Sequence, residues 1–177
     1  MKKHKTLGQK IAFSSHLFKV ETEEVELASG KIVSRDRILH PGAIIVIPQT
    51  SDGKLLLVNQ YRHSIREELL EFPAGTLEVG EVIKQCAERE LAEEVGKKAS
   101  QWQELGHLYP GPGILNEIQY LFFAKGLSDV EQNLDDEEII EVRPMTPLQV
   151  EEAIRSGKIN DGKTIASYFK AKVMGLI

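Results

Sequence analysis

Three glutamates, Glu90, Glu93 and Glu94, stand at spacings i, i+3 and i+4 in a segment of helical composition. A helix turns by about 100° per residue, so their carboxylates share one face within an arc of about 100°. Like charges at this spacing repel one another, and a divalent cation would stabilise them. Hard oxygen donors suit Mg²⁺ or Mn²⁺ better than Zn²⁺. The alternative is a solvated acidic face, with Arg89 and Lys97 as partial counter-charges.

The helix that carries these glutamates is predicted over residues 82–95, which contain no proline or glycine. Gly96 follows directly and is typical of a helix C-terminus. Ala87, Leu91 and Val95 form an apolar stripe beside the carboxylates. We expect this stripe to pack on a sheet and to leave the carboxylates at the edge of the packed surface.

The other elements are predicted from alternation, apolar runs and turn residues. Strands are expected over residues 17–27, 32–39, 43–48, 54–60, 69–72, 103–109, 119–124 and 139–145. The first two form a predicted hairpin turned at Ser29-Gly30, and the third and fourth form another turned at Asp52-Gly53. Residues before about Ile11 are polar and are expected to be loose.

Two helices are predicted at the end of the chain. The first has Thr146 as N-cap, Pro147 at the first helical position and Gln149 in a capping-box pattern. The second covers residues 163–174, with Asp161 near its start. Early strands, one central helix and two final helices indicate an α/β fold of the α+β type, with a mixed sheet covered by helices.

The composition narrows the function classes. The chain has 177 residues, 41% of them hydrophobic and 28% charged, which suits a soluble protein with one compact core. No apolar stretch approaches the ~20 residues of a membrane span, and no secretory signal is apparent, so a cytoplasmic protein without a membrane partner is expected. A net charge of −5 argues against nucleic acid as a partner. The single cysteine, Cys86, excludes an intrachain disulfide and a cysteine-based zinc site.

The residues around the acidic helix resemble the Nudix box, which is a glycine, five residues, a glutamate, seven residues, then Arg-Glu-apolar-any-Glu-Glu-any-Gly-apolar. Eight positions agree: Gly75, Glu81, Arg89, Glu90, Leu91, Glu93, Glu94 and Gly96. Lys97 takes the last place, where an apolar residue is usual. The resemblance implies the Nudix fold, a mixed sheet sandwiched between helices, with Mg²⁺ held by the strand-loop-helix of the box.

Other segments resemble the branch of Nudix enzymes that hydrolyse ADP-ribose and nucleoside diphosphate sugars. They are residues 57–62 and 69–75, the proline-bearing loop 109–117 and the acidic run 135–142. The amino-terminal strands fit the small antiparallel sheet that pairs two subunits in this branch. The expected organisation is a dimerisation segment over residues 1–40, a Nudix hydrolase domain over residues 41–177, and a homodimer.

The resemblance also implies roles for single residues. Glu90 and Glu94 are the expected primary metal ligands, together with the carbonyl of Ala74. Glu93 is expected to be a further ligand or to hold the reacting water, and Arg89 to orient the carboxylates.

The acidic run 135–138 resembles the loop that brings a catalytic glutamate over the metals. Glu138 directly precedes an apolar strand and is the first candidate for the general base. Glu137 and Asp136 are its rivals, and a solvated acidic run is the alternative.

Three residues are candidates for substrate contacts. Arg62 follows a predicted strand and has the geometry to clamp a phosphate with two hydrogen bonds, with a surface ion pair as the alternative. Arg37 is a second candidate of this kind, and Glu117 lies in the proline-bearing loop.

The expected function is Mg²⁺-dependent hydrolysis of the diphosphate of ADP-ribose, or of a related nucleoside diphosphate sugar, to a nucleoside monophosphate and a sugar phosphate. A GDP-mannose hydrolase is an alternative within the same class. A Nudix ligand sensor without turnover is an alternative from a different class.

Overall fold

The computed structural model describes residues 4–134 and 139–177. The candidate bases Glu137 and Glu138 and their neighbour Asp136 lie outside the described residues. The chain forms two compact units, Met1–Gly42 with Tyr109–Ile118, and Ala43–Leu108 with Gln119–Ile177. Among the described residues, no helix is long and apolar enough to cross a membrane.

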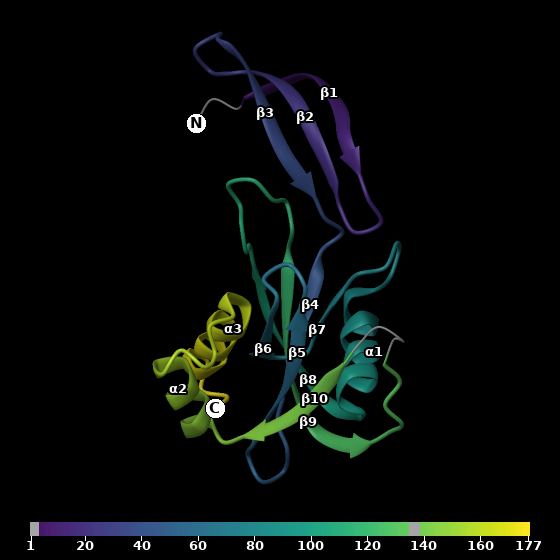
Figure 1. Ribbon diagram of the computed structural model, residues 1–177, viewed down its shortest axis with the longest axis vertical. Helices are drawn as coiled ribbons and strands as arrows, with labels where there is room; N and C mark the ends of the chain where they lie inside the picture. Colours follow the sequence, from purple (N-terminus) through teal and green to yellow (C-terminus); the bar gives the residue numbers. More distant parts are fainter. Residues whose placement is uncertain (1–3, 135–138) are drawn as a thin grey trace. The chain divides into compact units, whose positions relative to one another are not determined.

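The first unit holds a three-stranded antiparallel sheet of β1 (Lys5–Ser14), β2 (Lys19–Glu26) and β3 (Ile32–Leu39), with β2 in the centre (Figure 1). β2 and β3 form the predicted hairpin, and Gly30 in its turn has a φ of 82°. The expectation of a loose segment before Ile11 is wrong for residues 5–10, because they belong to β1, which pairs with β2 from Lys5 onward. Backbone hydrogen bonds stabilise this strand, and they do not depend on its polar side chains.

The loop after β8, Tyr109–Ile118, belongs to this unit through the end of β3. The N–H of Ile38 donates to the Ile114 carbonyl at 2.7 Å, and the N–H of Asn116 donates to the Ile38 carbonyl at 3.1 Å. The N–H of His40, 76 residues earlier in the chain, donates to Oδ1 of Asn116 at 2.7 Å. The proline-bearing loop is therefore held by the N-terminal strands.

The second unit contains two sheets and three helices among its described residues. Its strands are β4 (Ala43–Pro48), β5 (Leu55–Arg62), β6 (Glu67–Glu71), β7 (Ala74–Thr76), β8 (Lys97–Leu108), β9 (Gln119–Asp129) and β10 (Ile140–Met145). Its helices are α1 (Ile83–Val95), α2 (Pro147–Arg155) and α3 (Gly162–Val173). The sheet orders are β7-β4-β9-β8 and β10-β5-β6. β4 is parallel to β9 and antiparallel to β7, so the first of these sheets is mixed, as predicted.

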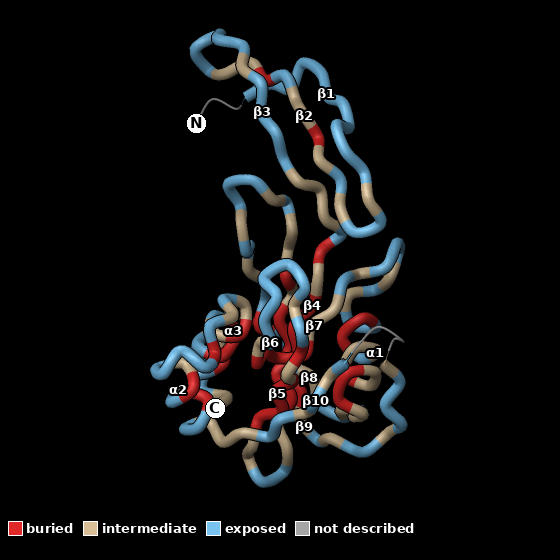
Figure 2. The backbone as a smooth tube through the Cα atoms, viewed as in Figure 1, coloured by how far each residue is buried: buried red, intermediate tan, exposed pale blue. Residues whose placement is uncertain are grey.

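The helices of this unit cover the strands from two sides (Figure 1). Because side chains alternate along a strand, successive residues of β4 face opposite sides. Ile45 and Ile47 belong to a core cluster shared with α2 and α3, whereas Ile44 and Val46 belong to a cluster shared with α1. Figure 2 shows buried residues concentrated in these central strands. The predicted mixed sheet between helices is confirmed.

Two strand predictions are wrong. β4 and β5 do not form a hairpin but lie in different sheets, joined by an isolated bridge between Gln49 and Leu55. Both strands are largely buried between other strands of the chain. β4 pairs with β7 and β9, and β5 pairs with β10 and β6, so the Asp52-Gly53 turn between them does not decide the pairing. β8 begins at Lys97 instead of near residue 103, and it pairs with β9 from that residue. The first residues of β8 are mostly polar and do not alternate clearly, so the sequence pattern did not indicate a strand there.

The predicted C-terminal glycine of α1 and the predicted capping box of α2 are present, and Asp161 caps α3. Gly96, in the left-handed conformation with φ of 65°, ends α1. Thr146 and Gln149 form the reciprocal capping box of α2. Oδ2 of Asp161 accepts the N–H of Thr164 at 2.9 Å at the start of α3.

Candidate active site

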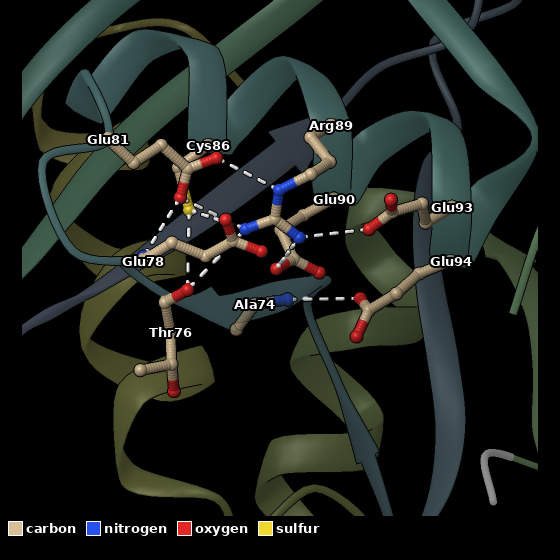
Figure 3. A network of polar contacts seen from close by, with 9 residues as sticks. All are labelled: Ala74, Thr76, Glu78, Glu81, Cys86, Arg89, Glu90, Glu93 and Glu94. Carbon is tan, nitrogen blue, oxygen red and sulfur yellow. Dashed lines mark hydrogen bonds and ion pairs between the residues drawn. The ribbon is translucent and has the colours of Figure 1, made fainter. Parts of the chain in front are cut away.

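The glutamates of α1 lie beside the backbone of β7 (Figure 3). A Cβ atom on Gly75 would lie 1.8 Å from Oε1 of Glu90, so the absence of a side chain at Gly75 makes room for this carboxylate. The N–H of Ala74 donates to Oε2 of Glu94 at 3.1 Å, and Glu94 is 2% exposed. β7 therefore positions two of the three predicted ligands.

α1 packs through the apolar stripe that its sequence predicts. Ala87, Leu91 and Val95 are buried in the cluster shared with β4 and β5. Glu90 and Glu93 lie half-buried beside this stripe. The arrangement places these two carboxylates at the edge of the packed surface, as expected, whereas the third glutamate is buried with the stripe.

Arg89 joins the acidic side chains into one network (Figure 3). Its Nη1 donates to Oε1 of Glu90 at 2.7 Å and to Oε2 of Glu93 at 2.9 Å. Its Nε and Nη2 donate to the two carboxylate oxygens of Glu81 at 2.9 and 3.1 Å. Hydrogen bonds to Glu81, followed by the charge of Glu90, raise the pKa of Arg89 above its ordinary value. One permanent cation therefore offsets the repulsion between the carboxylates.

Glu81 braces the loop that leads into α1. Its Oε2 accepts the N–H of Glu78 at 3.0 Å, and its own N–H donates to the Glu78 carbonyl at 3.1 Å. Gly80 supplies the φ of 81° that this turn requires. The hydrogen bond from Arg89 lowers the pKa of Glu81 to about 2, so its carboxylate is ionised at neutral pH.

Cys86 packs as a small buried residue. It is fully buried in α1, and burial, followed by the neighbouring Glu81 carboxylate, raises the pKa of its thiol to about 12.

The donor chemistry of the network fits a hard divalent cation. Glu90, Glu93 and Glu94 offer only carboxylate oxygens, which Mg²⁺ and Mn²⁺ prefer. Within the described part of the chain, no three His, Cys, Asp or Glu residues are already arranged as a metal cluster. Lys97 pairs with Asp129 across β8 and β9, so it is not a counter-charge of the acidic face.

Arg62 lies in a different charged group of the same unit. Its Nε and Nη2 donate to the two oxygens of the Glu71 carboxylate at 2.6 and 2.8 Å, and Glu71 is fully buried. The ammonium of Lys163 also contacts Glu71. Sequence reasoning missed Glu71 and Lys163. A charge directly after two leucines and before a phenylalanine was a signal for Glu71, whereas only the tertiary structure brings Lys163 to it.

The other two candidate substrate contacts belong to the first unit. Arg37 on β3 donates from Nε to Oε1 of Glu21 at 2.8 Å and pairs with Glu23 at 3.0 Å. Glu117 is half-buried in the loop held by β3. The three predicted acidic ligands and Ala74 therefore lie together in the second unit, with Arg62 in a separate charged group there.

Comparison with known proteins agrees with this geometry. A family model described as NUDIX domain matches residues 39–168. The chain is 36% identical over 162 residues to the ADP-ribose pyrophosphatase of Bacillus subtilis, a match that covers 90% of this chain and 88% of that protein. It is 36% identical over 163 residues to the methanol dehydrogenase activator of Bacillus methanolicus, which covers 91% and 88% of the two chains.

More distant proteins are also similar. The GDP-mannose pyrophosphatase of Yersinia enterocolitica is 32% identical over 145 residues, which covers 77% of this chain and 75% of that protein. A crystal structure of an ADP compounds hydrolase superposes with a TM-score of 0.88 at 23% identity, over 100% of this chain and 98% of that one. At that identity the structural likeness shows the fold alone.

Proposed function

The chain belongs to the NUDIX domain family, and from this membership we propose that it is a pyrophosphatase of the ADP-ribose diphosphatase type. It hydrolyses the diphosphate of ADP-ribose, or of a related nucleoside diphosphate sugar, to a nucleoside monophosphate and a sugar phosphate. The observation that carries the proposal is the placement of Glu90 and Glu94 beside β7, with Arg89 hydrogen-bonded to Glu90 and Glu93.

The reaction requires charge neutralisation, because water attacks a phosphorus atom surrounded by negative oxygens. The water oxygen bonds to one phosphorus, the bridging P–O bond breaks, and the proton of the water passes to a carboxylate. Glu90, Glu93, Glu94 and the Ala74 carbonyl are the groups that would hold Mg²⁺, or Mn²⁺, which supplies charge neutralisation and a water of lowered pKa when bound. Arg89 keeps the carboxylates on one side of α1.

We assign the general base to Glu138, with Glu137 as its nearest rival. The support is the acidic sequence 135–138, which is separated from β10 by Ile139 alone. Glu93 remains a second candidate for holding the attacking water, because it is half-buried at the edge of α1.

Arg62, Arg37 and Glu117 are the proposed substrate contacts. The guanidinium of Arg62 has the geometry that matches a phosphate, although its Nε and Nη2 already donate to Glu71. Arg37 and Glu117 have their proposed roles from the resemblance of their segments to nucleoside diphosphate sugar hydrolases.

Product analysis tests the proposal. The purified chain is incubated with ADP-ribose, GDP-mannose or UDP-glucose, with Mg²⁺ and separately with EDTA, and the monophosphates are quantified by chromatography. Mg²⁺-dependent release of AMP and ribose 5-phosphate is expected. Preference for GDP-mannose would favour the alternative hydrolase, to which the Yersinia relative points. A ligand sensor would bind ADP-ribose and return it unchanged.

We also propose that two chains pair through the sheet of the first unit. Every residue of β1 is exposed, including Leu7, Ile11 and Phe13, and Val25 is the one buried hydrophobic residue of that sheet among its described residues. A three-stranded sheet with so little core gains stability by covering its apolar side chains and its edge with a second chain.

A further inference from the structure

Four charged side chains form one connected group between β5, β6 and the start of α3. Glu71 accepts hydrogen bonds from Arg62 and from the ammonium of Lys163. Lys163 also donates to Oδ2 of Asp161 at 3.0 Å. Glu71 is fully buried, and 15% of the Lys163 side chain is exposed. The two positive and two negative charges of this group balance one another.

Such a group is a poor way to stabilise a fold, because apolar side chains of similar volume often give equal or greater stability. Burial and the nearby guanidinium of Arg62 lower the pKa of Lys163 to about 7, which reflects the unfavourable surroundings of its charge. The group does provide a fixed orientation for the guanidinium of Arg62. A carboxylate that accepts from both Nε and Nη2 holds a guanidinium in one plane.

Arg62 keeps hydrogen-bonding capacity after this contact. Arginine has five N–H donors, and two of those on Arg62 are used by Glu71. The structure gives the remaining donors, on Nη1 and Nη2, no partner among the residues it describes, and 35% of the side chain is exposed. These donors form an edge that suits an anionic phosphate oxygen.

The first turn of α3 also holds the backbone that leads into β7. Oγ1 of Thr164, which is fully buried, accepts the N–H of Phe72 at 2.9 Å. Two residues later, the N–H of Ala74 holds Glu94. The start of α3 therefore contacts both the side chain of Glu71 and the backbone N–H of Phe72, in the segment that leads into β7.

We propose that Lys163 is a positioning residue for substrate binding, which acts on Arg62 through Glu71. Its ammonium contacts the Glu71 oxygen that also accepts from Nη2 of Arg62, and so it holds the carboxylate in the orientation that aligns the guanidinium. Lys163 makes no contact with substrate. The inference rests on the proposed function, in which Arg62 binds the diphosphate of a nucleoside diphosphate sugar.

The experiment compares Lys163→Met, which removes the charge, with Lys163→Arg, which keeps it. Lys172→Met is the control, because Lys172 lies on the same helix and pairs with Glu151 away from Glu71. Steady-state KM and kcat are measured with ADP-ribose and Mg²⁺, and Kd for ADP-ribose is measured by calorimetry in EDTA. Lys163→Met should raise KM and Kd by about tenfold and change kcat by less than about threefold. Lys163→Arg should restore most of the binding, and the control should match wild type.

A double-mutant cycle with Arg62→Met separates positioning from general stability. If Lys163 acts through Arg62, the Arg62→Met/Lys163→Met protein should bind no more weakly than Arg62→Met alone. Thermal melts establish that each variant is folded, and Lys163→Gln replaces the methionine variant if that one unfolds. Additive losses, or wild-type KM and Kd in the uncharged variant, would overturn the inference. If the wild type neither binds nor hydrolyses any nucleoside diphosphate sugar, the proposed function fails, and the inference fails with it.

Discussion

At the scale of single residues, Arg89 explains how two carboxylates of α1 and one from the preceding loop lie close together. Its guanidinium donates to Glu90, Glu93 and Glu81, and it stays charged at every pH at which the protein is folded. The same hydrogen bonds limit the rotation of the carboxylates, so their positions are largely set before any cation or substrate binds. If these carboxylates hold a cation as proposed, their fixed positions reduce the reorganisation that catalysis requires.

Glu94→Gln tests the metal role most directly. The amide oxygen still accepts from Ala74 N–H, so we expect the fold to survive, whereas loss of the charge should lower turnover by ~10²-fold or more. Glu88→Gln is the matched control, since Glu88 is on the same helix and pairs with Lys84 at its exposed surface. Activity is measured at saturating Mg²⁺. Wild-type turnover in the Glu94 variant would mean that this glutamate has a structural role.

The base assignment predicts a specific kinetic change. Glu138→Gln should lower kcat by ~10²-fold, the usual range for loss of a general base, and should leave Mg²⁺ and substrate binding nearly unchanged. Glu137→Gln and Asp136→Asn are compared in the same assay, with the pH dependence of kcat recorded for each. If one of these neighbours loses activity while Glu138→Gln retains it, the role belongs to that neighbour.

The thiol of Cys86 should resist labelling in the folded protein. With its pKa raised to about 12, about one thiol in ten thousand is ionised at pH 8, and the side chain is fully buried. Because the pKa is raised, ionisation should increase only as the pH approaches 12. Reaction with a disulfide reagent at pH 8 should be slow in buffer and fast in concentrated guanidinium chloride. Equal rates in both would contradict the burial of this residue.

At the scale of elements, the contact of α1 with β7 decides where the glutamates lie. Gly75→Ala tests it, because the added Cβ would meet the Glu90 carboxylate at 1.8 Å. The flexible end of Glu90 should move while the backbone keeps its place, and a ligand displaced by about 1 Å can lower the rate by about 10²-fold. Gly8→Ala is the control, since nothing lies within 4 Å of a Cβ there. Unchanged activity and Mg²⁺ dependence in Gly75→Ala would show that the close approach of β7 to the Glu90 carboxylate does not matter for catalysis.

At the scale of the whole molecule, the weak core of the first unit predicts a homodimer. Leu7, Ile11 and Phe13 on β1 are 44%, 49% and 53% exposed, and β1 is an edge strand of its sheet. Light scattering at micromolar concentration should therefore return about twice the chain mass of 19.8 kDa. Phe13→Ser should weaken the pairing, whereas replacement of the exposed Phe169 on α3 should not. A monomer mass for the wild type would rule the dimer out.

The elements that sequence predicted well are those whose signals are local. Capping at Thr146 and Asp161 and termination at Gly96 depend on neighbouring residues, so their patterns transfer directly to the structure. The spacing of Glu90, Glu93 and Glu94 likewise needs only the helical repeat to place them together. The polar strand β1 and the separation of β4 from β5 were missed, since both depend on partners elsewhere in the chain.

The family could be inferred from the amino-acid sequence, because the Nudix box is a short-range spacing of glycine, glutamate and arginine residues. The helical repeat likewise sufficed to place Glu90, Glu93 and Glu94 on one helix face. The burial of Glu94 against Ala74 and the contact of Lys163 with Glu71, 92 residues apart, could not be inferred in this way. Contacts over such separations depend on how sheets and helices pack, which a linear pattern does not encode residue by residue. The charged group around Glu71 forms because α3 packs beside β6, and this packing could not be inferred from the sequence pattern.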